Sequence, residues 1–580
     1  MDTKLNVELN IEGTSIEHFN SFTLRQAFNE HHYFELRYNH DQVGEPGIIT
    51  LQDSRGYVGK NLTIQFGVEG GDQQVFTGKI TKVELAQSHG YHGVVIISGF
   101  SPSILIDRGP DMGSYLAKDL AGIIQLATQD APSNDLQIKL NPSRTAPIDY
   151  IIQYRESDFE FINRLSAEYF EWFYYDGVQL NFGKPAQQSA DVQLVYGRDV
   201  HNLQYGMQVA PLKYRKFAYN PKENEVLSSE SQVPQGGQPD LSFAVQASNT
   251  VYSKTYNQPT PVRIDTKSDI DSHVENESKA LVSDLLKING GGDNPLVRLG
   301  GIVNIDMSLW QGTDFETQNL GRFLVTSVFH QLDGLGHYYN SFEGVTADTE
   351  RIPVRSYQKP EPDFQLAIVL DNNDPMKQGR VKVTFKWDCT SNDPTEWLRV
   401  VSPNAGKGDT GDNRGFMVVP EVGDQVLVGF EEGNIARPLI LGCVYHGKNV
   451  NSGGFVNSNT KALNSRKGST LTFDDGSHAL NLQTTSANAL QIMEQSGALS
   501  LTAAQNVTHQ SGKNTIVVQS GDNSITLTAD TTITLKSGKG SITIQNNGAI
   551  TIKGESVTVE AANNHIKGES KLDGGNVFIN

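Results

Sequence analysis

The stretch SITLTADTTITLKSGKGSITIQNNGAITIKGESVTVE, residues 524–560, decides the fold of the C-terminal part of the chain. Pairs of apolar residues separated by one polar residue recur in it, with leading positions 8, 9, 8 and 7 residues apart. Apolar residues at every second position predict strands with one apolar face, and the Gly, Asn and Ser between the pairs predict turns. The candidate core residues are Ile525, Leu527, Ile533, Leu535, Ile542, Ile544, Ile550, Ile552, Val557 and Val559.

A repeat of about eight residues cannot bury its apolar face alone, so stacking must supply the core. Because the repeat is too short for one chain to wrap around itself, the economical arrangement is three chains that share one triangular prism. The pattern therefore predicts a homotrimeric needle over residues 466–580. Its Ile, Leu and Val residues would line the axis, and its strand edges would pair between chains.

The chain before the needle has a different composition. No Pro follows Pro438, and no Tyr or Trp follows Tyr445. The 580 residues contain 47 Lys and Arg against 66 Asp and Glu, which gives a formal net charge of -19. Such a chain would repel a phosphate backbone, so we expect no nucleic-acid partner. The length predicts several domains.

The cysteines and the N-terminal sequence indicate the cellular compartment in which the protein assembles. The two cysteines, Cys389 and Cys443, fit a reduced cytosolic chain, and we expect both to be buried as small apolar side chains. The sequence MDTKLNVELNIEG lacks the basic and apolar segments of a signal peptide, and no run approaches the roughly 18 apolar residues of a membrane span. We therefore expect assembly in the cytoplasm, followed by export through another machine to the outside or into a target cell.

The pattern of short apolar strands in residues 360–447 predicts a small barrel. In GRVKVTFKW, residues 379–387, the side chains of Val381, Val383, Phe385 and Trp387 share one face of a strand. In GFMVVPEVGDQVLVGF, residues 415–430, we expect two strands on either side of a turn in PEVGD. Further strands at 366–370, 397–401 and 438–445 complete a barrel of about five to six strands.

The first 350 residues read as mostly β, with alternating segments such as Leu5, Val7, Leu9 and Ile11. Residues 153–177, QYRESDFEFINRLSAEYFEWFYYDG, change period: Ser157 and Glu160 form a capping box before a short amphipathic helix. We expect strands at 172–175 and 178–182, joined by a two-residue turn at Asp176 and Gly177. A second helix is predicted at 275–287 and is ended by glycines 290–292.

Several of these segments resemble the VgrG spike proteins of type VI secretion and other contractile injection systems, a family related to the hub and needle of phage tails. The YRESDF motif at 154–159 and VTSVFHQLDGLGHYYNSFEGV at 325–345 are similar to the hub. Three further stretches resemble the OB-fold module of this family. They are DNNDPMKQGRVKVTFKW at 371–387, GFMVVPEVGDQVLVGFEEGN at 415–434 and RPLILGCVYHG at 437–447.

The resemblance implies a mainly β chain with four parts. These are a hub of two related β-barrels with short helices at 1–355, an OB-fold at 356–447, a linker at 448–465, and a triple-stranded intertwined β-helix needle at 466–580. Three hubs would present six similar barrels to a hexameric, Hcp-like tube protein. Baseplate proteins, effectors or their adaptors, and a PAAR-repeat tip protein are the further implied partners.

The implied tip-protein site lies at the end of the needle, at Val577, Phe578, Ile579 and Asn580. The alternation continues through Val577 and Ile579, and we expect no appended domain after it. The last strands of the needle would then end in exposed apolar side chains, which the tip protein would cover. The alternative is a frayed terminus.

No catalytic, cofactor or metal residue is predicted, and we expect no enzyme. About twenty residues, 447–466, separate the OB-fold from the needle, whereas an inserted hydrolase needs on the order of a hundred. Asp474, Asp475 and Glu494 could form an acid/base set, but the aspartates precede Gly476 and favour a hairpin turn. The histidines, including His31 and His32, have no zinc-ligand spacing. Gly538, Lys539 and Gly540 read as a needle turn.

The sequence thus predicts a structural spike whose trimer caps the inner tube, punctures the target envelope and carries a tip protein and effectors. Two alternatives remain open. One is the spike of an extracellular contractile particle or a phage tail, and the other is a polysaccharide-degrading tailspike enzyme.

Overall fold

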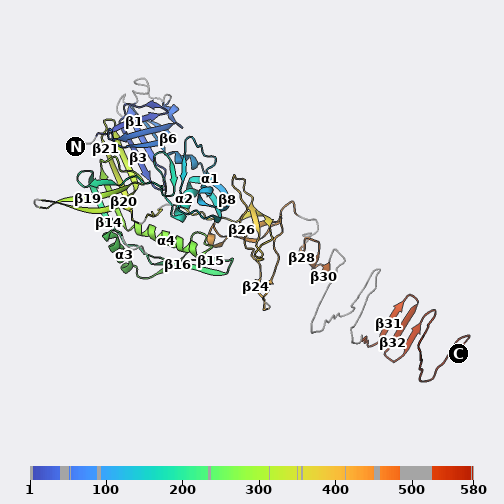
Figure 1. The fold of residues 1–580 in the computed structure, drawn as a ribbon. Coiled ribbons are helices and arrows are strands. Elements are labelled where there is room, and N and C mark those ends of the chain that lie inside the picture. The colour runs from blue at the N-terminus through green and yellow to red at the C-terminus, as the bar shows by residue number, and fades with distance from the viewer. Residues whose placement is uncertain are drawn as a thin grey trace. The chain divides into compact units, whose positions relative to one another are not determined.

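The computed structural model describes residues 4–39, 51, 54–87, 93–232, 237–311, 314–348, 350–354, 357–409, 411, 413–449, 458–477, 479–483, 526–576 and 578 (Figure 1). The chain divides into two compact units, Met1–Gly454 and Phe455–Asn580. Strands dominate both units, so the predicted mainly β class is confirmed.

Within the described residues of the first unit, 13 strands form one sheet. They are β1 (Asn6–Ile11), β2 (Thr14–Ser15), β3 (Ser21–Ala27), β4 (Tyr33–Asn39), β5 (Asn61–Gly67), β6 (Gln73–Gln87), β7 (Gly93–Phe100), β13 (Val192–Val195), β14 (Val200–Met207), β18 (Leu286–Gly292), β19 (Ile302–Gln311), β20 (Asp314–Asp333) and β21 (Tyr338–Thr346). The order is β14-β18-β21-β20-β3-β4-β7-β6-β5-β1-β2, and β19 pairs with both β20 and β13.

Two hydrophobic cores lie on this sheet, and β20 joins them. Its C-terminal half pairs with β3, from Ser327 opposite Ala27 to Asp333 opposite Ser21. Its N-terminal half pairs with β19. One core contains Phe22, Phe34 and Phe76, and the other contains Phe323 and Phe342. The two halves of the hub therefore share a continuous sheet.

The strands around each of the two hydrophobic cores form a set, and backbone contacts link the two ends of each set. In the first set, the Leu5 amide before β1 donates to the carbonyl of Gly336, in the turn between β20 and β21, at 2.9 Å. In the second set, a bridge between Tyr196 and Val200 connects β13 with β14. In the described hub, each set of strands is therefore linked at its two ends.

Four helices and smaller sheets complete the described hub. The helices are α1 (Leu120–Ala127), α2 (Asp158–Tyr169), α3 (Pro239–Val251) and α4 (Lys267–Ser283). The remaining strands are β8 (Asp111–Lys118) paired with β10 (Ile148–Glu156), β9 (Ile138–Leu140) with β11 (Phe173–Tyr175) and β12 (Leu180–Phe182), and β15 (Tyr214–Asn220) with β16 (Glu225–Glu230) and β17 (Tyr256–Pro259). The sequence did not predict α1 or α3. No helix among the described residues is both long and apolar enough to cross a membrane.

Helix α2 begins as predicted. The Ser157 hydroxyl accepts from the Glu160 amide at 3.1 Å, and the Glu160 carboxylate accepts from the Ser157 amide at 2.9 Å. The predicted two-residue turn after β11 is wrong, because Tyr175 lies opposite Leu180 and four residues connect the strands. The Asp176 carboxylate accepts from the amides of residues 178 and 179, which fixes this wider turn.

The predicted bounds of the second helix are also wrong. Helix α4 starts eight residues earlier, where the Thr266 hydroxyl accepts from the Asp269 amide, and it ends at Ser283. The glycines at 290–292 lie in β18 instead of ending a helix. A Cβ atom at Gly290 would come within 2.4 Å of the Phe342 ring, so this strand needs glycine for close packing.

The OB-fold module is a closed barrel. Strands β22 (Gln365–Asp371), β23 (Lys382–Phe385), β26 (Gln425–Phe430) and β27 (Pro438–Cys443) pair in the order β23-β22-β26-β27. The segment 398–400 closes the ring, because Leu398 bridges to Val381 and Val400 bridges to Ile440. Val381, Val383 and Phe385 are buried on one face, as predicted.

Of the two strands predicted on either side of PEVGD, the second is β26 and the first is wrong. Residues 416–419 form no strand, and Phe416, Met417 and Val418 are exposed. The short strands β24 (Ala405–Lys407) and β25 (Asn413–Gly415) pair with each other just before them. The prediction for the cysteines is wrong as well, since Cys389 is half-buried and Cys443 is exposed.

The second unit contains two three-stranded antiparallel sheets in its described residues. They are β28 (Thr460–Asn464), β29 (Thr470–Asp474) and β30 (Ala479–Gln483), and β31 (Thr532–Ser537), β32 (Gly540–Gln545) and β33 (Ile550–Lys553). Strand β28 falls within the predicted linker 448–465 and pairs with β29. Gly538 and Lys539 form the turn between β31 and β32, as predicted, with Gly538 at φ +52°.

Candidate functional surfaces

The sheet β31-β32-β33 carries its apolar side chains on one face. Ile533 lies opposite Ile544, and Leu535 lies opposite Ile542. Ile542 in turn lies opposite Ile552, and Ile544 lies opposite Ile550. Of these six side chains Ile533 is half-buried and the other five are exposed, with exposed fractions between 40% and 65%. In one chain, this face is an apolar surface that nothing in the described residues covers.

The sheet β28-β29-β30 repeats this arrangement. Leu463 lies opposite Leu471, which lies opposite Leu482, and Phe473 lies opposite Leu480. Four of the five are exposed, and Leu471 is half-buried. Sequence reasoning left these residues out of the core set. The pairs Leu471/Phe473 and Leu480/Leu482 are nine residues apart, so the same repeat could have found them.

The other predicted core and tip residues are placed only in part. Leu527, Val557 and Val559 are described and exposed, whereas Ile525 lies outside the described residues. At the predicted tip site, Phe578 is 88% exposed, and Val577, Ile579 and Asn580 lie outside the described residues. The predicted tip site therefore stays a prediction.

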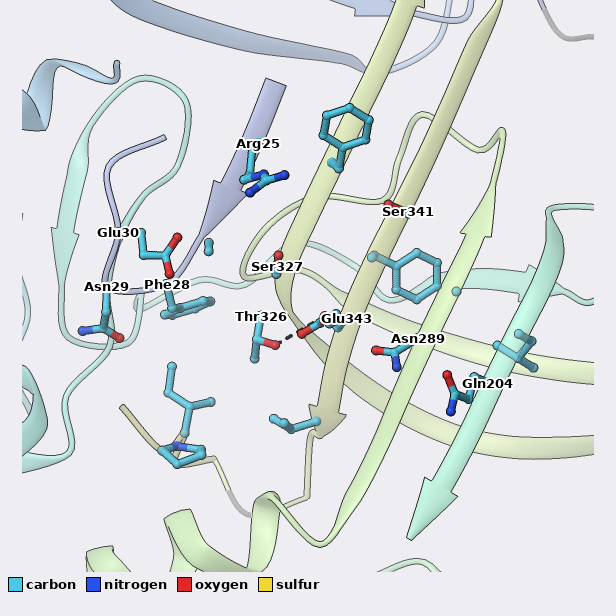
Figure 2. A pocket seen from close by; sticks show the side chains of 18 of the residues that line it. Arg25, Phe28, Asn29, Glu30, Gln204, Asn289, Thr326, Ser327, Ser341 and Glu343 are labelled. Atoms are coloured by element: carbon cyan, nitrogen blue, oxygen red, sulfur yellow. Dashed lines mark hydrogen bonds between the residues drawn. The ribbon is translucent and has the colours of Figure 1, made fainter. Parts of the chain in front are cut away.

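The hub has a pocket of about 760 Å³ on the outer face of the shared sheet (Figure 2). Its floor is two rows of side chains that cross five strands, β14, β18, β21, β20 and β3. One row contains Gln204, Asn289, Glu343, Ser327 and Ala27, and the other contains Asn202, Ser341, Phe329 and Arg25. Phe28, Asn29 and Glu30, after β3, and Ile352 and Pro353 form the sides.

Sequence reasoning did not find this pocket. The pocket exists because β20 pairs with β3, about 300 residues away in the sequence. No local sequence pattern predicts that pairing. On β3, β20 and β21 the floor residues alternate with buried residues such as Leu24, Val328 and Phe342, which reads in the sequence only as a half-buried sheet.

The structure places the possible acid/base residues in a turn. The Asp474 carboxylate accepts from the amides of Gly476 and Ser477, between β29 and β30, as the predicted hairpin turn requires. Asp475 pairs with Lys461, and Glu494 lies outside the described residues. His31 bonds to Ser103 and Asp107, and His32 bonds to Gln26. Among the described residues, no group of three His, Cys, Asp or Glu side chains could hold a metal ion.

Two stretches of the first unit match known protein families. Residues 49–334 match the family of the phage tail baseplate hub, and residues 365–445 match the injector OB domain of type VI secretion systems and phage baseplates. The chain belongs to the VgrG spike family. VgrG5 of Pseudomonas aeruginosa, a type VI secretion system spike protein, is 26% identical over 351 residues, which are 54% of this chain and 42% of that protein.

Two further VgrG relatives are similar over longer stretches. VgrG1b, another P. aeruginosa spike protein, is 22% identical over 432 residues, which are 67% of this chain and 54% of that protein. The actin cross-linking toxin VgrG1 of Vibrio cholerae is 24% identical over 359 residues, which are 57% of this chain and 31% of the toxin. The aligned regions thus span about half or less of each of these three proteins.

Solved VgrG-containing assemblies share the fold. Chains in the lidded and half-lidded structures of the Francisella PdpA-VgrG complex match with TM-scores of 0.52 and 0.51 at 8% identity. Both matches cover 95% of this chain, and 80% and 88% of the matched chains. At this level of identity the likeness concerns the fold.

Proposed function

We propose that this chain is the structural spike of a contractile injection apparatus, in which three copies share the C-terminal strands as one needle. The observation that carries the proposal is the pair of apolar faces on β28-β29-β30 and β31-β32-β33. Burying an exposed Ile or Leu side chain contributes about 1.5–3 kcal/mol, so a shared core of many such residues favours association strongly. The interchain strand pairing of the needle remains part of this proposal.

Paired substitutions on β32 and β33 test the shared core. Ile542→Lys with Ile552→Lys places two charges on the apolar face, where the two residues lie opposite each other. Thr543→Lys with Thr551→Lys places the same charges at the neighbouring opposed pair, on the other face. Light scattering of the wild type and of the Thr pair should give about three times 63.6 kDa, whereas the Ile pair should give a lower mass. A monomeric wild type would refute the proposed needle.

The hub and the tip would contact other proteins of the apparatus. Six similar half-hubs in a trimer would match a hexameric, Hcp-like tube, and Phe578 with the residues around it would hold a PAAR-repeat tip protein. Phe578→Asp should weaken capture of that tip protein, whereas Asn576→Asp should not. Baseplate proteins and effectors or their adaptors complete the proposed partners. The apparatus would assemble in the cytoplasm and then carry the spike out of the cell or into a target.

We infer that the spike acts mechanically, by transmitting thrust to a target envelope, and makes or breaks no bond. The relatives are spike proteins by name, except for the V. cholerae actin cross-linking toxin, and the match to the toxin covers only 31% of it. Incubation with cell-wall and capsule polysaccharides tests the tailspike alternative. Any turnover that Asp475→Asn abolishes would establish an enzyme instead.

A further inference from the structure

The strands of the OB module carry apolar side chains on both faces. The inward-facing residues, such as Ala367, Val369 and Val428, are at most 1% exposed and fill the core of the barrel. Most of the outward-facing residues on β22, β26 and β27 are aliphatic as well. Six of these side chains form what we call the sheet surface: Leu366, Ile368, Leu370, Leu427, Leu439 and Leu441. Strands that read as such continuous apolar runs are typical of sheets that are covered on both faces.

The sheet surface is open to solvent in one chain. Leu366, Leu370 and Leu441 are 41%, 46% and 38% exposed, and the other three side chains are half-buried. Leu366 lies directly opposite Leu427, so the surface is continuous from β22 to β26. The described part of the chain therefore leaves an aliphatic surface on the outside of a barrel whose core is already complete.

A second apolar surface of the module lies away from these strands. We call it the end surface, and it consists of Phe416, Met417 and Val418, which are 50%, 70% and 55% exposed. The Phe416 amide donates to the carbonyl of Asn404 at 2.8 Å, and the Pro420 carbonyl accepts from the Asn372 side chain at 3.0 Å. The segment thus runs from beyond the closing segment 398–400 to beyond the end of β22. Because both surfaces stay exposed, neither covers the other within one chain.

Two different apolar surfaces on one module favour a second copy of the chain as the occupant. In a head-to-tail ring, each copy uses one surface toward the next copy and another toward the previous copy, whereas a two-fold dimer needs only one self-complementary surface. Neither surface contains a charged residue, so their contact brings no like charges together in a chain of formal charge -19. Residues 444–459 alone connect β27 with β28, so a trimeric needle would hold three OB modules at a high effective concentration.

We propose that the OB modules of neighbouring copies associate head to tail, with the sheet surface of one copy packed against the end surface of the next. The inference rests on the proposed function, because the trimeric needle sets the number of copies in the ring. It adds a contact between copies within the first unit, so the needle strands are not the sole connection between them.

Cross-linking of the full chain tests the contact. Cys389→Ser and Cys443→Ser remove the natural thiols, and Leu441→Cys with Met417→Cys then places one thiol on each surface. A short bis-maleimide should join copies of this variant into species of about two and three times 63.6 kDa on a denaturing gel. Leu441→Cys alone and Met417→Cys alone are the matched controls. In a head-to-tail ring like surfaces do not meet, so each control should give about fivefold less cross-linked product.

A charge on the sheet surface should break the contact without dissolving the needle. Leu370→Lys, added to the variant with both thiols, should lower the cross-linked yield about fivefold, because the lysine would have to be desolvated in the interface. Leu370 is 46% exposed in one chain, so we expect an unchanged circular dichroism spectrum. Thr390→Lys adds the same charge at an exposed polar position of the module and should preserve the yield. Light scattering should give about three times 63.6 kDa for both variants.

The outcomes separate this inference from the proposed needle. A trimeric wild type whose two-thiol variant cross-links no better than the single-thiol controls would reject the contact between OB modules and leave the needle standing. A monomeric wild type would reject both. If Leu441→Cys in the trimer reacts freely with a bulky maleimide, and is protected only when another protein of the apparatus is added, the sheet surface belongs to that protein and the inference is wrong.

Discussion

Arg164 binds both carboxylate oxygens of Glu156 in the interior of the hub, through Nε at 2.7 Å and Nη2 at 2.9 Å. The same guanidinium donates to Glu168 at 3.3 Å and to the carbonyl of Ile152 at 2.7 Å. Only 1% of the Arg164 side chain is exposed. Burial opposes the charge, yet Glu168 and Glu156 hold the pKa of Arg164 above its usual range. This cluster ties helix α2 to strand β10.

Replacing Arg164 with Met should destabilise the hub strongly. The substitution leaves Glu156 and Glu168 buried with their main cation removed, and a buried ion pair broken on one side costs about 3–5 kcal/mol. We expect a lower urea midpoint for the first unit, measured by circular dichroism.

Arg155 provides the matched control for that substitution. It pairs with Asp363 at 3.0 Å, but the two side chains are 63% and 70% exposed. Arg155→Met should therefore change the free energy of unfolding by less than about 1 kcal/mol. Equal midpoints for the two variants would mean that the buried cluster contributes little to stability.

The sequence showed where α2 begins but not what surrounds it. The capping box at Ser157 and Glu160 is local, so the residues themselves reveal it. Arg164 reads as a solvated residue on an amphipathic helix. It is buried because β10 packs against that side of the helix, where Glu156 and Ile152 bond to Arg164, and because Lys359, about 190 residues away in the sequence, pairs with Glu168 at 3.6 Å. The same limit hid the pocket, whereas the period-two repeat of strands β31, β32 and β33 is local and was visible in the sequence.

Acid should destabilise the hub before its carboxylates titrate. Gln26 lies between two buried histidines, bonded to Nδ1 of His32 at 3.1 Å and to Nε2 of His330 at 3.2 Å. Burial lowers the pKa of both histidines from 6.5 to about 3. A histidine with a lowered folded pKa contributes its full stability above pH 6.5 and loses it as the pH falls toward 3, because the unfolded state binds the proton first. The urea midpoint should fall between pH 7 and pH 5.

Variants separate this effect from general acid sensitivity. His330→Gln should flatten the dependence of the midpoint on pH, even if it lowers the midpoint at pH 7. His201→Gln removes a half-exposed histidine and should leave the slope unchanged. A slope that His330→Gln does not alter would contradict the assignment of the titrating group.

The OB module should not fold when it is cut from the hub. Tyr150, Ile152 and Tyr154 of β10 lie in the same hydrophobic core as Val383 and Phe385 of the barrel. Residues 358–449 alone would lack these side chains and expose part of that core. We expect poor dispersion in the amide proton spectrum of this fragment, and a cooperative transition for residues 4–449.

Substitution of Tyr154 tests the same junction in the intact chain. Its hydroxyl accepts from Gln365 at 3.1 Å, at the start of the OB module. Tyr154→Ser should lower stability by about 3–5 kcal/mol, as for other large aromatic truncations in cores. Phe364→Ser, at a side chain that is 68% exposed, should have little effect. A well-folded 358–449 fragment would show that the hub and the OB module are independent.

The apolar face of β28-β29-β30 should take part in the shared core, if the trimeric needle is correct. Leu471→Lys with Leu482→Lys charges two opposed residues of this face, and Thr472→Lys with Asn481→Lys charges the opposed pair on the other face. We expect the Leu pair alone to lower the oligomeric mass or the resistance of the oligomer to SDS without boiling, because lysine in an apolar core must be desolvated. A stable trimer in the Leu pair, together with its loss in Ile542→Lys with Ile552→Lys, would confine the shared core to the later strands. The proposal of a trimeric needle would then hold, and the strands from Thr460 to Gln483 would lie outside its shared core, in contact with solvent.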